Sequence, residues 1–133
     1  MDFQTETNKQ TEENTENEEL KLKLEKQISI AVWIQFIGSI MEAVLLSKIM
    51  LISEEVRSDP NEREVLRGVW ISTIGQFLDG VGTTKQVMTS DEIMQLEGEV
   101  ISNIGDWIKV AGGILDAHGG SQIIAKERAE FFP

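Results

Sequence analysis

Hydrophobic side chains follow a helical period along most of the chain, and one arrangement of them occurs three times. The sequence has three tryptophans, Trp33, Trp70 and Trp107, and consecutive ones are 37 residues apart. Each is followed by Ile at +1, Gly at +5, apolar residues at +7 and +8, an acid at +9 and a small residue at +10. This regularity indicates an internal repeat of 37 residues.

The apolar positions of each copy fall on one broad face of a helical wheel, which predicts three amphipathic helices. The first, over residues 28–52, is apolar nearly all round and has one narrow polar stripe that includes Glu42. Such a helix is either the most buried element of a bundle or a membrane segment. About 20 apolar residues suffice to span a bilayer. Because Glu42 lies inside the stretch and the other two copies are more polar, we favour the buried, soluble interpretation.

Polar residues indicate where the second helix begins. Residues 53–59 read as a helix end and a connector, and Asp59 before Pro60 fits an N-cap followed by proline at the first helical position. The second helix is therefore expected to run from Pro60 to about residues 80–82, where glycines occur, with residues 85–88 as either its last turn or a short separate one.

The third helix is predicted from a capping box and a glycine pair. Thr89 and Glu92 have the Thr-x-x-Glu spacing of a capping box, which places the helix start near residue 90. The Gly-Gly pair at 119–120 is expected to end the helix. Residues 121–133 then form either a short docking helix or a loose end.

Glycines recur inside the predicted helices at spacings of seven residues. A glycine inside a helix costs about 1 kcal/mol relative to alanine, so five would cost on the order of 5 kcal/mol, comparable to the stability of a small domain. We expect close approach of neighbouring helix backbones to offset this cost. The alternative, weak helices broken at glycine, fits the regular spacing less well. The five interior glycines are Gly38, Gly68, Gly75, Gly105 and Gly112.

The predicted fold is all-α, an antiparallel bundle of three long helices over residues 19–133. Three long apolar helices can close on each other, so a single open layer is not expected. Residues 1–18 have Phe3 as their one large apolar side chain, and we predict that they form a disordered acidic tail. An apolar flank left uncovered by three helices would favour a homo-oligomer.

Composition and charge disfavour some binding partners and indicate a cellular location. The chain has 23 acidic and 12 basic residues, a net charge of −11, and no cysteine. This charge opposes binding to nucleic acid and to anionic lipid. The acidic start lacks the basic and apolar regions of a secretory signal, so a cytoplasmic location is expected, with association with a spore or a membrane left open.

Candidate chemistry is sparse. Glu42, Asp79 and Asp116 occupy equivalent positions and could in principle converge on a cation. In an antiparallel bundle, however, equivalent positions are displaced along the axis, and no ligand-dense loop is present. We therefore expect these acids at the wet edges of their helices, the three tryptophans in the core, and no catalytic residue, metal or cofactor.

The units W-I-x-x-I-G-x-x-x-[DE]-[AG] at residues 31–45, 68–82 and 105–119 resemble those of small, uncharacterised "repetitive" proteins of Gram-positive spore-forming bacteria. This chain departs from their pattern at Ala31, Leu45 and Ala111. The resemblance implies a helical repeat protein and carries no assigned activity.

Together these patterns predict a non-enzymatic helical repeat protein that acts by self-association or by binding another protein through an apolar helix face. The alternative is a membrane-interacting protein, either peripheral or inserting through residues 28–52.

Overall fold

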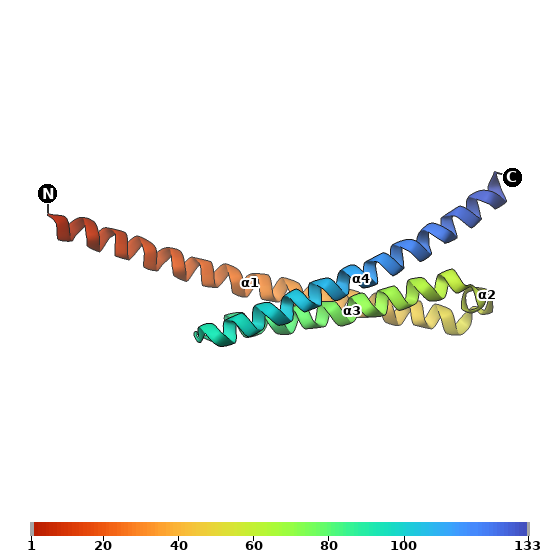
Figure 1. The fold of residues 1–133 in the computed structure, drawn as a ribbon, viewed down its shortest axis with the longest axis horizontal. Coiled ribbons are helices and arrows are strands. Elements are labelled where there is room, and N and C mark those ends of the chain that lie inside the picture. Colours follow the sequence, from red (N-terminus) through yellow and green to blue (C-terminus); the bar gives the residue numbers. More distant parts are fainter. Residues whose placement is uncertain (1, 133) are drawn as a thin grey trace.

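The computed structural model describes residues 2–132, and this part of the chain is all-helical (Figure 1). It contains four helices: α1 (Phe3–Ile52), α2 (Glu54–Ser58), α3 (Pro60–Val87) and α4 (Glu92–Phe131). Successive long helices run in opposite directions, and the two ends of the chain project away from the region where the helices pack (Figure 1).

The long helices form one layer with α3 in the middle. Helix α3 contacts α4 extensively and α1 over a shorter stretch, whereas no Cα atom of α1 lies within 8 Å of one in α4. The expectation that the helices close on each other is therefore wrong. Each outer helix has one long neighbour and a large face without a covering helix.

This arrangement also overturns the expectation that residues 28–52 form the most buried element. On α1 only Ser29, Val32 and Ala43 are buried, while most of its large apolar side chains, such as Ile34 and Ile37, are exposed. The physical reason is that α3 is the one long helix that packs against α1, and one such neighbour covers only one side of a helix that is apolar nearly all round.

The amino-terminal part of α1 differs from the predicted disordered tail. Residues 3–18 continue the helix, although every side chain from residue 2 to 24 is exposed. Asp2 caps the helix, and the hydroxyls of Thr7, Thr11 and Thr15 donate to the carbonyls four residues earlier. Residues 2–18 contain no glycine or proline and many good helix formers, so local propensity extends the helix without burial. Met1 lies outside the described residues.

Helix α3 begins as predicted, and residues 85–87 form its last turn, which is one of the two predicted alternatives. The Asp59 carboxylate accepts a hydrogen bond of 2.8 Å from the Asn61 amide, and Pro60 is the first helical residue. The helix continues past the glycines at residues 80 and 82 to Val87. The connector before it includes the five-residue helix α2.

The third helix starts within two residues of the predicted position, but its capping residue and its end are corrected. Asp91 caps α4 by accepting a hydrogen bond of 3.0 Å from the Ile93 amide, and Thr89 accepts one from Asp91 instead of capping the helix. The helix passes through the glycine pair at 119–120 and ends at Phe131. Residues 121–131 are therefore its last three turns and not a separate docking helix or a loose end.

Candidate functional site

Helices α3 and α4 meet through pairs of facing glycines. A Cβ atom built at Gly75 would lie 2.6 Å from the carbonyl oxygen of Gly105, and one at Gly105 would lie 2.6 Å from that of Gly75. Both distances are far below van der Waals contact. Gly68 faces Gly112 and Gly82 faces Gly98 in the same way, with Cβ positions 2.5 to 2.7 Å from the opposite carbonyl oxygen. The two backbones therefore touch at three glycine pairs, and successive pairs are seven residues apart along each helix.

Four of the five glycines predicted to lie at close approaches do so, and the fifth does not. Gly38 has no heavy atom within 4 Å of its Cβ position. It lies on the part of α1 that no helix covers, next to Ala31 and Leu45 at the neighbouring seven-residue steps. The departures of this first copy thus fall on a face that contacts no other helix.

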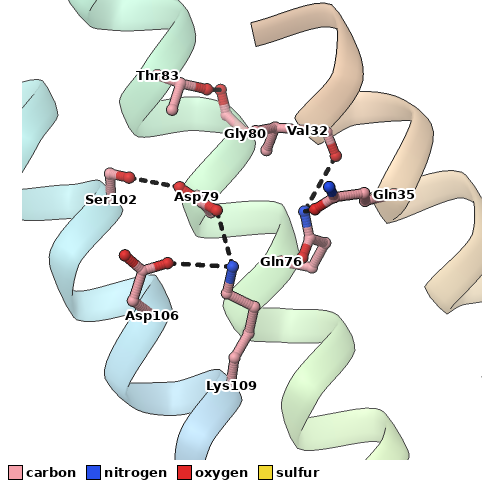
Figure 2. Close-up of polar contacts among 9 residues, drawn as sticks. All are labelled: Val32, Gln35, Gln76, Asp79, Gly80, Thr83, Ser102, Asp106 and Lys109. Atoms are coloured by element: carbon pink, nitrogen blue, oxygen red, sulfur yellow. Dashed lines mark hydrogen bonds and ion pairs between the residues drawn. The ribbon is translucent and has the colours of Figure 1, made fainter. Parts of the chain in front are cut away.

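A polar cluster joins α3 and α4 (Figure 2). It lies beside the central glycine pair, because the Cβ position of Gly105 is 2.8 Å from the Asp79 amide nitrogen. The Asp79 carboxylate, 8% exposed, receives the Lys109 ammonium at 2.8 Å and the Ser102 hydroxyl. Lys109 also contacts Asp106, at 3.0 Å. Burial lowers the pKa of Lys109, but its hydrogen bonds with Asp79 and Asp106 outweigh that effect and leave this pKa above its ordinary value. The cluster therefore holds a charged pair between α3 and α4.

The structure does not bring the three equivalent acids together. Glu42 is exposed on α1, Asp79 is buried between α3 and α4, and Asp116 is half-buried near Gly68. The expectation that all three acids lie at the solvent-exposed edges of their helices is wrong for Asp79, because the glycines let α4 approach closely enough to cover this residue. The described residues include no group of three or more acids or histidines able to hold a metal ion.

The contact between α1 and α3 is made by rings and neutral polar groups. Trp33 covers Gly80, whose Cβ position would lie 3.0 Å from the indole ring, and its Nε1 donates a 2.7 Å hydrogen bond to the Thr84 hydroxyl. Trp33 also meets Phe36 and Phe77 edge to face, with ring centroids 5.8 Å apart in both pairs.

Buried polar side chains in this second interface are all hydrogen-bonded. Gln76 donates to the Val32 carbonyl at 3.0 Å and to Gln35 at 3.2 Å, as Figure 2 shows. The hydroxyls of Ser29 and Thr84 are 3.1 Å apart. Among the described residues no buried side-chain nitrogen or oxygen lacks a partner. The interior of the layer is therefore largely glycine and polar.

The three tryptophans do not share one environment. Trp33 is half-buried, Trp70 is 37% exposed and donates to the Ser47 hydroxyl at 3.0 Å, and Trp107 is 69% exposed. The expectation that all three lie in the core is wrong for Trp107, because no helix packs on its side of α4.

Large apolar side chains gather instead on the outer surfaces of α1 and α4. On α4 they alternate at three- and four-residue steps on the side away from the glycines, where they form a continuous exposed line that we name the α4 stripe. The α4 stripe consists of the large apolar residues Ile93, Leu96, Val100, Trp107, Val110, Ile114 and Ile124, together with the smaller or polar Asn103, Ala117 and Ser121 at the same steps.

One described helix, α1, has a stretch of 18 residues apolar enough to cross a membrane by length and composition. Only 17% of that stretch is buried within the described chain.

Comparison with protein-family models, with curated proteins and with solved structures finds no match to the chain. The resemblance suggested by the W-I-x-x-I-G units therefore stays a prediction.

Proposed function

We propose that this is a non-enzymatic helical protein that acts by association through its exposed apolar helix faces, with copies of itself or with another protein. The observation that carries the proposal is the distribution of side chains. Glycines and polar groups line the contact between α3 and α4, whereas the large apolar side chains of α1 and α4 point outward. Contiguous exposed apolar surface of this kind is typical of an interaction site.

The proposed organisation is an antiparallel arrangement of three long helices, each with one copy of the 37-residue unit. The contacts of α3 with both neighbours support it, and α2 serves as a connector. In this organisation Gly68, Gly75, Gly105 and Gly112 are packing residues, and Trp33 and Trp70 join α1 to α3.

The buried charges support a structural role rather than catalysis. Both carboxylate oxygens of Asp79 are engaged, one by Lys109 and the other by Ser102. An acid held in this way is not free to transfer a proton to a substrate. The net charge of −11 favours a protein partner over nucleic acid.

Sedimentation of the full chain over a range of concentrations tests the proposal. We expect the mass to rise to a whole multiple of the monomer, and the monomer to bind a hydrophobic dye that the assembled form binds less. A strictly monomeric protein that binds no dye would refute association through apolar faces.

The exposed apolar stretch of α1 favours a second candidate, interaction with a membrane through residues 28–52. Burial of this stretch in lipid would satisfy side chains that α3 leaves uncovered. Flotation with neutral and with anionic vesicles tests it, and we expect binding to neutral vesicles because the protein is acidic. Failure to float with either kind removes this candidate and leaves a cytoplasmic protein with protein partners as the proposal.

A further inference from the structure

The contact between α1 and α3 is reciprocal. Trp33 of α1 donates to Thr84 of α3, and Trp70 of α3 donates to Ser47 of α1. Each acceptor lies 14 residues after the tryptophan of its own helix. The two helices therefore exchange the same hydrogen bond in both directions, as the two halves of a twofold-symmetric pair do.

The residue that Trp33 covers on α3 is small, and so is the residue with the equivalent spacing on α1. Trp33 covers Gly80, which lies 10 residues after Trp70, and the corresponding residue 10 after Trp33 is Ala43, 0% exposed. In this antiparallel pair each helix therefore has three features: a tryptophan, a small residue 10 positions later and a hydroxyl 14 positions later.

Helix α4 has all three features and no helix against them. Trp107, Ala117 and Ser121 have the same spacing, and all three are exposed on the α4 stripe. The Ser121 hydroxyl donates to the Ala117 carbonyl at 2.8 Å, as the Ser47 hydroxyl donates to the Ala43 carbonyl at 2.8 Å. Its oxygen is thereby oriented as that of Ser47 is, with a lone pair free to accept.

We propose that the α4 stripe binds the α4 stripe of a second copy of this chain, antiparallel, with Trp107 of each copy donating to Ser121 of the partner subunit. This inference rests on the proposed function and specifies the partner and the surface. The tryptophan-bearing faces of α1 and α3 already pair with each other within the chain. The tryptophan-bearing face still available to pair with the α4 stripe is therefore the α4 stripe of another copy.

The register of the pair also fits the length of α4. Placing Trp107 over Ala117 of the partner subunit puts the twofold axis next to residue 112, which is the middle of a helix that runs from Glu92 to Phe131. The two helices then overlap over their whole length, about 60 Å at 1.5 Å per residue. In the same register Asn103 lies opposite Ser121 of the partner subunit, as Ser29 lies against Thr84 within the chain.

Crosslinking of single-cysteine variants tests the geometry, because the chain has no cysteine of its own. Ile114→Cys lies next to the axis, so a short bis-maleimide is expected to join two copies. Ile93→Cys lies opposite residue 131 of the partner subunit and is expected to remain uncrosslinked. Crosslinking of both variants would show a parallel pair and overturn the proposal.

Sedimentation of surface variants separates this inference from the proposed function. We expect Ser121→Ala to raise the dimer Kd roughly tenfold or more, because symmetry removes two hydrogen bonds at once. Ile114→Ala is expected to weaken the dimer further, whereas Ile30→Ala on the exposed face of α1 leaves Kd unchanged. The three replaced side chains are exposed, so circular dichroism should show the native helix content. If Ile30→Ala alone breaks the dimer, association holds and the α4 interface is wrong. A monomer at every concentration refutes both.

Discussion

The two faces of α3 join their neighbours by different means. Toward α4, glycine backbones touch directly and one charged cluster lies beside them. Toward α1, rings cover small residues, and neutral side chains bridge the helices by hydrogen bonds. The first contact leaves no room for an added atom, whereas the second is made by side chains that can adjust. The glycine contact should therefore be intolerant of substitution, and the tryptophan contact should lose stability in small steps.

Gly75→Leu provides the strongest test of this difference. The Cβ atom of the new side chain would lie 2.6 Å from the Gly105 carbonyl oxygen, so the helices must separate. We expect the free energy of unfolding to fall by about 3 kcal/mol relative to the natural chain. Urea unfolding followed by circular dichroism measures the loss. Trp70→Phe is the comparison from the other face, and equal tolerance of the two changes would contradict the argument from backbone contact.

Lys109→Met tests the charged cluster. Removing the ammonium leaves Asp79 buried with Ser102 as its remaining partner, and we expect the free energy of unfolding to fall by about 1–3 kcal/mol at neutral pH. Because the pKa of Lys109 is raised in the folded protein, its contribution is fully present below the ordinary value of 10.5 and is lost as pH rises through the folded value.

The difference between Lys109→Met and the natural chain should therefore shrink in alkaline solution. Urea unfolding at pH values below and above 10.5 measures this change. Lys21→Met is the matched control, since the Lys21 side chain is exposed and its contact with Glu25 is 3.7 Å long. A pH-independent difference would mean that Lys109 contributes through packing and not through its charge.

Trp33→Phe tests the face toward α1. The change keeps a ring over Gly80 but removes the hydrogen bond to Thr84, so a loss of about 1 kcal/mol is expected. Trp107→Phe is the matched control and should leave the stability of the monomer unchanged, because its ring is exposed. Unfolding of both variants at a concentration where the protein is monomeric distinguishes them. Equal losses would show that Trp107 is packed within one chain.

Gly38→Ala is expected to have the smallest effect, and of opposite sign. No heavy atom lies within 4 Å of the new Cβ, so the variant gains the helix propensity of alanine, about 0.5–1 kcal/mol. A higher unfolding midpoint in urea would confirm that the glycine positions of α1 are not packed, and destabilisation would show that another helix covers this face.

Local signals in the sequence predicted the start of α3 correctly. Asp59 and Pro60 marked the start of α3 because an N-cap and a first-turn proline act within one turn. The seven-residue glycine spacing predicted the contact between α3 and α4. The glycine pair at 119–120 was misleading because glycine serves both to end a helix and to admit a neighbour, and Gly119 does the latter, facing the Asn61 carbonyl.

The sequence did not show which apolar helix faces are covered by another helix. The pattern of residues 28–52 is the same whether one helix or two pack against it, so burial could not be read from it. The pair formed by Asp79 and Lys109 was also missed, although a signal existed. Both residues lie opposite the tryptophan of their own helix and next to the glycines, which places them on facing surfaces.

Among the long helices, α1 and α4 each contact only α3, so the extensive contacts join long helices that follow one another in the chain. Each of these contacts closes only the chain between two neighbouring long helices, so the contact order is low. The chain should therefore fold quickly, in the microsecond to millisecond range of low-contact-order helical proteins. The hairpin of α3 and α4 has the more extensive contact and should form first, with α1 docking afterwards on the exposed face of α3.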